Sequence, residues 1–100
     1  MPRVSIDVPH QLNQDEVVER LRRKTAAVRS TFQDHISEFQ EDWTDHHVQF
    51  SIKAMGMKTT GTVAVEPEKV HVNLELPFAA MLFRGTIESR VRQELGELLQ

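Results

Sequence analysis

Cysteine is missing from this sequence of 100 residues. The chain therefore forms no disulfide, offers no thiolate nucleophile and supplies no cysteine ligand to zinc. Long apolar runs are missing as well. No stretch approaches the ~20 apolar residues that cross a bilayer, and the segment from Met1 to Asp7 lacks the apolar core of a signal peptide. We therefore expect a cytoplasmic protein with no transmembrane segment.

The sequence also lacks an excess of positive charge. Its net charge of -3 gives no overall attraction to polyanions, so no nucleic-acid partner is expected. One basic run, Arg20 to Lys24 together with Arg29, is interleaved with acidic residues and has no aromatic stacking platform, and we interpret it as a solvated helix face. A Gly-rich phosphate loop and a Gly-x-Ser-x-Gly motif are both missing, and no cofactor is expected.

The composition that remains is typical of a globular protein. Hydrophobic residues make up 39% of the chain and charged residues 27%, which argues against disorder. One hundred residues suit one domain with one core, so residues 1–100 are expected to form a single unit.

Alternation of apolar and polar residues predicts the strands. Residues 3–8 alternate with period two, and Pro9 ends this segment because proline donates no ladder hydrogen bond. A short strand around Phe39 and Trp43 and three alternating segments between residues 48 and 76 follow. Their links, including Met55–Lys58 and Glu66–Lys69, are short enough only for hairpins, which indicates an antiparallel meander.

Apolar residues spaced by three and four predict a helix on each side of the meander. The first begins after Asn13, which forms a capping pattern with Glu16, and spans roughly 20 residues. Its apolar stripe consists of Val17, Val18, Leu21, Thr25, Val28, Phe32 and Ile36. The last helix carries Ile87, Val91, Leu95 and Leu98 on one face; it begins either at Thr86, as a cap, or near Phe78.

These patterns predict an α+β fold in which an antiparallel sheet of four or five strands has two helices packed on one face, in the order β-α-β-β-β-β-α. The opposite face is left in contact with water. Its expected side chains are Arg3, Ser5, Gln49, Ser51, Lys53, His71, Asn73 and Glu75.

Histidines and acidic residues offer the obvious candidates for chemistry. The chain has five histidines, but no His-x-His or His-x-x-x-His spacing, and we expect no metal site. An acidic cluster beside Trp43 is interpreted as a solvated turn rather than an acid–base pair. We expect no enzyme; the groups whose convergence in a concave site would overturn this are His46, His47, His71, Asp42, Asp45 and Glu75.

The most unusual segment runs from Leu76 to Gly85 and contains six consecutive apolar residues. If it is helical, Phe83 continues the core stripe toward Ile87, and other apolar side chains fall outside that stripe. Two interpretations stay open: the segment tucks beneath the end of the sheet, or it forms a docking patch for an apolar surface. The candidate docking residues are Phe78, Met81, Leu82, Arg84 and Arg90.

Three features occur in an order that resembles a small bacterial family, the putative polyhydroxyalkanoic acid system proteins. They are Val4-x-Ile6 leading to Pro9-His10-Gln11-Leu12, then Val70-x-Val72-x-Leu74-x-Leu76, then Phe83-Arg84-Gly85-x-Ile87-Glu88. The resemblance covers essentially the whole chain. It implies association with polyhydroxyalkanoate granule storage or its regulation, and it brings no catalytic residues.

Two functional hypotheses for this chain follow. The first is a non-enzymatic docking protein whose partner is an apolar granule surface or another protein, and a homodimer would strengthen such a contact. The alternative is a domain that binds a small hydrophobic ligand or acyl chain, in the manner of helix-grip folds. The alternative requires a cavity of some 300 Å³ between sheet and helices.

Overall fold

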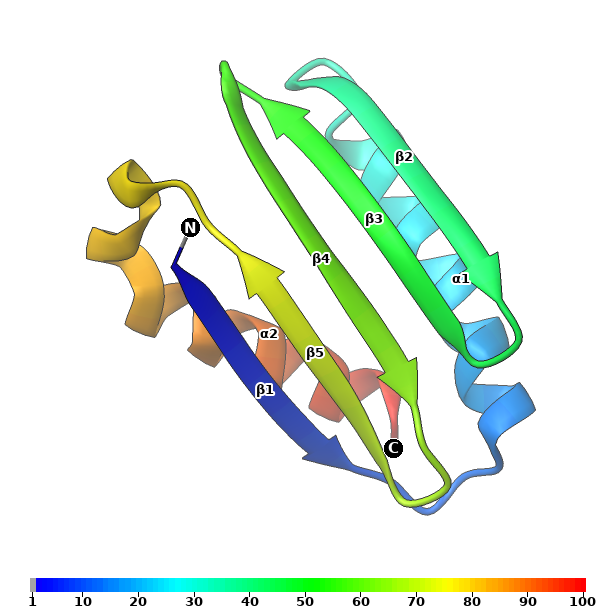
Figure 1. The fold of residues 1–100 in the computed structure, drawn as a ribbon. Helices are drawn as coiled ribbons and strands as arrows, with labels where there is room; N and C mark the ends of the chain where they lie inside the picture. The colour runs from blue at the N-terminus through cyan, green and yellow to red at the C-terminus, as the bar shows by residue number, and fades with distance from the viewer. Residues whose placement is uncertain (1) are drawn as a thin grey trace.

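The computed structural model describes residues 2–100, and in it both helices lie on one face of a five-stranded antiparallel sheet (Figure 1). This confirms the predicted α+β class and element order. The elements are β1 (Arg3–Pro9), α1 (Gln14–Thr31), β2 (Ile36–Thr44), β3 (His47–Ala54), β4 (Met57–Val65), β5 (Lys69–Glu75), the 3-10 helix η1 (Phe78–Phe83) and α2 (Arg84–Leu98).

The strand order across the sheet is β1-β5-β4-β3-β2, and every neighbouring pair is antiparallel. Hairpins join β2 to β5 in sequence order, whereas β1 pairs with the last strand. The register of that pair sets Val4 opposite Leu74 and Ile6 opposite Val72. Apolar alternation in the two strands is therefore in phase, and both turn their apolar sides toward the helices.

The hydrophobic core lies where β1, β5 and β4 meet both helices. Val17 and Leu21 come from α1, and Leu95 and Leu99 come from α2 and its end. Fully burying a side chain of this size stabilises the fold by about 1.5–3 kcal/mol. The remaining members of the buried cluster are Val4, Ile6, Val8, Val65, Val70, Val72, Leu74 and Leu76.

Helix α1 begins at the predicted cap. The Asn13 side chain accepts a hydrogen bond from the backbone N–H of Glu16 at 2.8 Å. The helix ends at Thr31, so the prediction that its apolar stripe reaches Ile36 is wrong. Phe32 is already the C-cap, and Ile36 begins β2. Ile36 follows Phe32 by four residues, as in a helical stripe, but it lies outside the helix.

The basic run on α1 contacts other elements, which corrects its interpretation as a purely solvated face. The Arg22 guanidinium lies 4.6 Å from the centre of the Trp43 ring, and Arg29 lies 5.1 Å from that of Phe39. Arg20 donates to the backbone oxygens of Leu98 and Gln100 at 2.8 and 2.7 Å. The basic residues therefore hold α1 against β2 and against the end of α2.

A glycine in the middle of β4 is matched by an aromatic ring on β3. Gly61 on β4 lies opposite Phe50 on β3 in the register. A β-carbon placed on Gly61 would lie 2.6 Å from Phe50 Cζ and 2.5 Å from the Asn73 carbonyl oxygen. The ring therefore occupies space that only glycine leaves free.

Candidate functional site

The segment between β5 and α2 is short, apolar and only partly buried. Pro77, with φ -65°, ends the strand, and the Ala80 N–H donates to the Pro77 carbonyl at 2.9 Å. Six residues of 3-10 helix follow, and α2 starts directly at Arg84 without a side-chain cap. The helix start is thus neither at Thr86 nor at Phe78, the two positions that the sequence left open.

Two residues of η1 pack against the domain, and three large apolar side chains of it are in solvent. Ala80 and Met81 contact the core cluster. Phe78 is 80% exposed, Leu82 90% and Phe83 61%. We call Phe78, Leu82 and Phe83 the η1 patch. The expectation that Phe83 continues the core stripe is wrong: the chain is still in the tighter 3-10 helix at this residue, and the side chain is exposed.

The two arginines named with this segment differ in position. Arg84 follows the η1 patch directly and lies 3.4 Å from Glu88 on the next turn of α2. Arg90 is further along α2 and pairs with Glu94 at 3.3 Å. Glu94 also receives Lys24 of α1 at 2.7 Å, so Arg90 belongs to an ion network between the helices.

The large exposed hydrophobic side chains of the described chain gather at one end of the domain. Besides the η1 patch they are Phe32 after α1 and Met55 and Met57 in the β3–β4 hairpin. These three connections lie where β2 and β4 begin and β3 and β5 end. We call this the apolar end; Phe32, Met55 and Met57 were not among the candidates from sequence, although methionines flanking a turn glycine are a visible signal.

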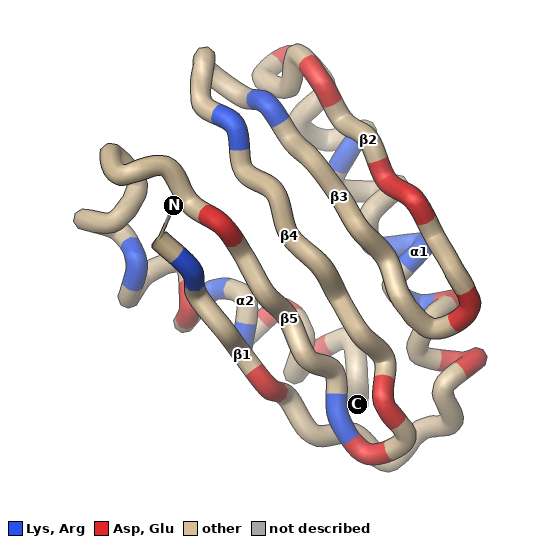
Figure 2. The backbone as a smooth tube through the Cα atoms, in the orientation of Figure 1, with Lys and Arg blue, Asp and Glu red and all other residues tan. Residues whose placement is uncertain are grey.

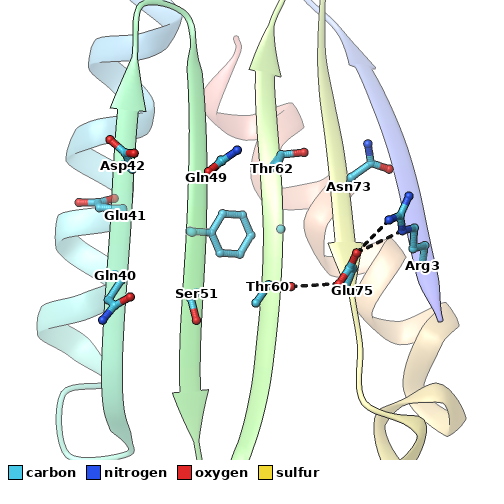
Figure 3. Close-up of a pocket in the computed structure, with 12 residues that line it drawn as sticks. Arg3, Gln40, Glu41, Asp42, Gln49, Ser51, Thr60, Thr62, Asn73 and Glu75 are labelled. Atoms are coloured by element: carbon cyan, nitrogen blue, oxygen red, sulfur yellow. Dashed lines mark hydrogen bonds and ion pairs between the residues drawn. The ribbon is translucent and has the colours of Figure 1, made fainter. Parts of the chain in front are cut away.

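The sheet face opposite the helices forms an open, polar trough of about 610 Å³ (Figure 3). Cross-strand pairs line one side of it. Arg3 contacts Glu75 at 3.1 Å, Thr60 donates to Glu75 at 3.4 Å, and Ser5 donates to Asn73 at 2.5 Å. These side chains satisfy one another, and the register confirms the predicted polar face.

A second hollow of about 290 Å³ is lined by residues of the two helices, Arg20, Arg23 and Lys24 of α1 and Leu98 of α2. Neither hollow lies between sheet and helices. The buried cluster of aliphatic side chains fills the region where a helix-grip domain holds its ligand.

Two histidines contact acidic residues, and neither partner is Asp42, Asp45 or Glu75, the acidic residues whose convergence with a histidine would have indicated an enzyme. His71 Nδ1 lies 2.5 Å from Asp7, and its Nε2 lies 3.1 Å from the Asn73 amide nitrogen. His46 lies 2.9 Å from Asp15. The Ser5 hydroxyl donates to Asn73 rather than to His71. Asp7 and Ser5 of β1 and His71 and Asn73 of β5 thus form a row of polar contacts between the two strands, which we call the polar ladder.

The ladder changes the ionisation of Asp7. The hydrogen bond from His71 holds the pKa of Asp7 below its ordinary value of 3.8, and Lys69 acts in the same direction, while desolvation opposes both. Hydrogen bonding from Lys24 likewise lowers the pKa of Glu94.

His10 is a buried polar residue, 8% exposed. Its Nδ1 accepts from the Leu12 backbone N–H at 3.1 Å, so Nε2 carries the proton and donates to the Glu66 carbonyl at 2.8 Å. The imidazole thus joins the β1–α1 connection to the β4–β5 turn, which is a structural role.

Among residues 2–100, no three His, Asp or Glu side chains are close enough together to hold a metal ion. Within the same residues, no helix combines the length and the apolar character needed to cross a bilayer.

Comparison with solved structures finds a crystal structure of TTHA0849 from Thermus thermophilus. It is 12% identical, with a TM-score of 0.36, and the alignment covers 98% of this chain and 92% of that one. A likeness this low carries no inference about function. Among curated proteins, no sequence matches significantly.

The comparison with protein families agrees with the order of motifs seen in the sequence. The model described as putative polyhydroxyalkanoic acid system protein matches residues 4–99, from β1 to the end of α2. The matched residues thus include the η1 patch, the β3–β4 hairpin and His10. The chain belongs to the putative polyhydroxyalkanoic acid system protein family.

Proposed function

We propose that this protein is a non-enzymatic docking protein that attaches to the surface of polyhydroxyalkanoate granules through the η1 patch. The family gives the polyhydroxyalkanoate context. The observation that carries the attachment is the exposure of Phe78, Leu82 and Phe83 within one six-residue 3-10 helix. A small globular domain rarely leaves such a cluster in water unless it binds something.

The size of the contact sets its strength. Transfer of roughly 300 Å² of apolar surface from water to polyester is worth about 7.5 kcal/mol at ~25 cal/mol/Å². Association costs remove much of this, so one domain binds weakly. Two domains joined as a homodimer would bind more tightly through effective concentration, without any new contact.

Support for docking rather than acyl-chain carriage comes from the location of apolar surface. The apolar side chains that remain free lie outside the domain at the apolar end, whereas the space between sheet and helices is filled. An acyl chain would have to displace buried residues such as Ile6 or Val70, which make up the core.

The test is co-sedimentation with lipid-free polyhydroxyalkanoate particles. The double variant Phe78→Asp, Leu82→Asp changes exposed side chains only and should keep the wild-type melting temperature. We expect it to lose particle binding at least tenfold, because two carboxylates would enter an apolar surface. The matched control Gln11→Asp, Ser89→Asp adds the same charge at exposed positions elsewhere and should bind like the wild type.

Wild-type binding by the Phe78→Asp, Leu82→Asp variant would remove the η1 patch from the mechanism. Loss of binding in both double variants would show that the added charge alone is responsible.

A further inference from the structure

The β3–β4 hairpin departs from the residue preferences of its own turn. Ala54 pairs with Met57, so the loop consists of Met55 and Gly56 alone. Both have positive φ, 53° and 77°. Such two-residue loops favour Asn or Gly at both positions, because a side chain with a β-carbon is strained in the left-handed region. Gly56 fits this requirement and Met55 does not.

The same hairpin opposes two like charges. Lys53 and Lys58 are direct cross-strand partners at the base of the turn. Figure 2 shows the two blue segments beside each other on β3 and β4. Among residues 2–100, no carboxylate oxygen lies within 4.0 Å of either ammonium group, although Glu38 is the register partner of Lys53. Like charges directly opposite one another destabilise a strand pair.

The exposure of two methionines is a third unfavourable feature of this hairpin tip. Met55 is 83% exposed and Met57 43%. A flexible hydrophobic side chain in water, a strained backbone position and an unneutralised lysine pair thus occur within six residues. Each lowers the stability of the free domain, and local departures of this kind concentrate at functional sites.

Both binding elements project from the same end of the sheet. The hairpin tip and the η1 patch belong to the apolar end, and Arg84 follows the patch. Methionine side chains bordered by lysines complement a surface that is apolar inside and negatively charged outside. A bare polyester surface would satisfy the methionines and leave the lysines without a counter-charge.

We propose that the β3–β4 hairpin is an anionic-phospholipid binding element: Met55 and Met57 enter the acyl layer, and Lys53 and Lys58 bind head-group phosphates. This inference rests on the proposed function, since it takes the apolar end as the docking side. It adds that the surface met by this end contains anionic phospholipid. An anion between the two lysines removes their mutual repulsion, so binding and hairpin stability are coupled.

The first experiment is flotation with vesicles of neutral phosphatidylcholine, with and without added phosphatidylglycerol. We expect at least tenfold tighter binding to the anionic vesicles, since each lysine near such a surface contributes about fivefold. The preference should shrink as salt is added, because exposed charges are screened. Equal binding to both vesicles, or binding to neither, would overturn the inference.

Substitutions separate the hairpin from the η1 patch. Lys58→Glu should lower binding to anionic vesicles at least tenfold, because it removes one positive charge and adds a negative one, and it should leave binding to lipid-free polyester particles unchanged. The matched control, Arg23→Glu on the exposed side of α1, has the same net charge and should keep the vesicle preference. If wild-type protein binds polyester but not anionic vesicles, the hairpin inference fails and the proposed function stands. If the Phe78→Asp, Leu82→Asp variant keeps polyester binding while Lys58→Glu loses vesicle binding, the proposed function fails and the hairpin inference stands.

A second readout excludes loss of folding as the cause. Met55→Asn relieves the strained backbone position, and Lys58→Glu replaces the repulsion with an ion pair to Lys53. Both variants should therefore melt a few degrees above the wild type while binding anionic vesicles less tightly. A fall in both melting temperature and vesicle binding would contradict the assignment of these residues to lipid binding.

Discussion

The replacement Gly61→Ala tests how tightly the sheet fits around the Phe50 ring. Alanine usually stabilises a strand relative to glycine by about 0.4–1 kcal/mol, because the unfolded chain loses freedom. Here the new β-carbon would lie 2.5 Å from the Asn73 carbonyl oxygen and 2.6 Å from Phe50 Cζ. Both distances are about 1 Å inside normal contact.

The two overlaps are relieved at different cost. The Phe50 ring can rotate away, which opens a void beside it. The Asn73 oxygen belongs to the backbone of β5, an interior strand, and moving it disturbs the ladder. Overpacking of this kind costs about 1–3 kcal/mol. After subtraction of the entropy gain, we expect a net loss of about 1–2 kcal/mol, which lowers the melting temperature by roughly 5–15 °C.

Urea denaturation followed by circular dichroism measures this loss. The midpoint should fall with little change in the slope, because the surface exposed on unfolding stays nearly constant. Gly96→Ala is the matched control: it lies in α2 with nothing within 4 Å of its new β-carbon, and it should stabilise the protein. In the double variant Phe50→Leu, Gly61→Ala, the loss should be smaller than the sum of the single losses. If Gly61→Ala proves as stable as Gly96→Ala, the fit described for the β3–β4 pair is wrong.

Three other perturbations test the polar contacts of the fold. Because the folded pKa of Asp7 lies below its ordinary 3.8, its pairing with His71 stabilises the protein above that pH and stops doing so as the pH falls through the folded value. Asp7→Asn should therefore be less stable than the wild type at neutral pH, and the difference should vanish in strong acid; a constant difference in pH-dependent melts would contradict this. Asn13→Ala removes the helix cap and should cost about 1 kcal/mol in urea denaturation, and an unchanged midpoint would show that the cap is dispensable. His10→Ala leaves two backbone groups without their partner and should cost about 1–3 kcal/mol, whereas a loss below about 0.5 kcal/mol, the smallest net value for one hydrogen bond, would mean that water replaces the imidazole.

The sequence predicts the strands well because each carries a strict alternation with one apolar side. Val70, Val72 and Leu74 face the core, and no other period fits them. Where the spacing was ambiguous the prediction failed. Ile36 is four residues after Phe32, so it fits a helical stripe, yet the chain has already left the helix. Periodicity contains no information on where a helix ends unless a capping residue marks it.

The candidate site is harder to predict because its properties depend on the placement of distant residues. Residues 78–83 are all apolar, and such a run gives no alternation from which an exposed side could be recognised. Phe83 in particular is exposed: it is the last residue of η1 and lies before the start of α2, so it does not share the helical stripe of Ile87. The contact of His71 with Asp7 joins residues 64 positions apart. It requires the β1–β5 register, which local patterns do not specify.

The pairing of β1 with β5 also bears on the order in which the protein assembles. Strands β2 to β5 meet through short links, whereas β1 must wait for a partner made more than 60 residues later. Closing so long a loop is entropically unfavourable and slow. Strand β1 is therefore expected to join the sheet last, after β2 to β5 have formed a four-stranded sheet. Substitution of Ile6 by Val should then accelerate unfolding and leave the refolding rate almost unchanged, which stopped-flow kinetics would show.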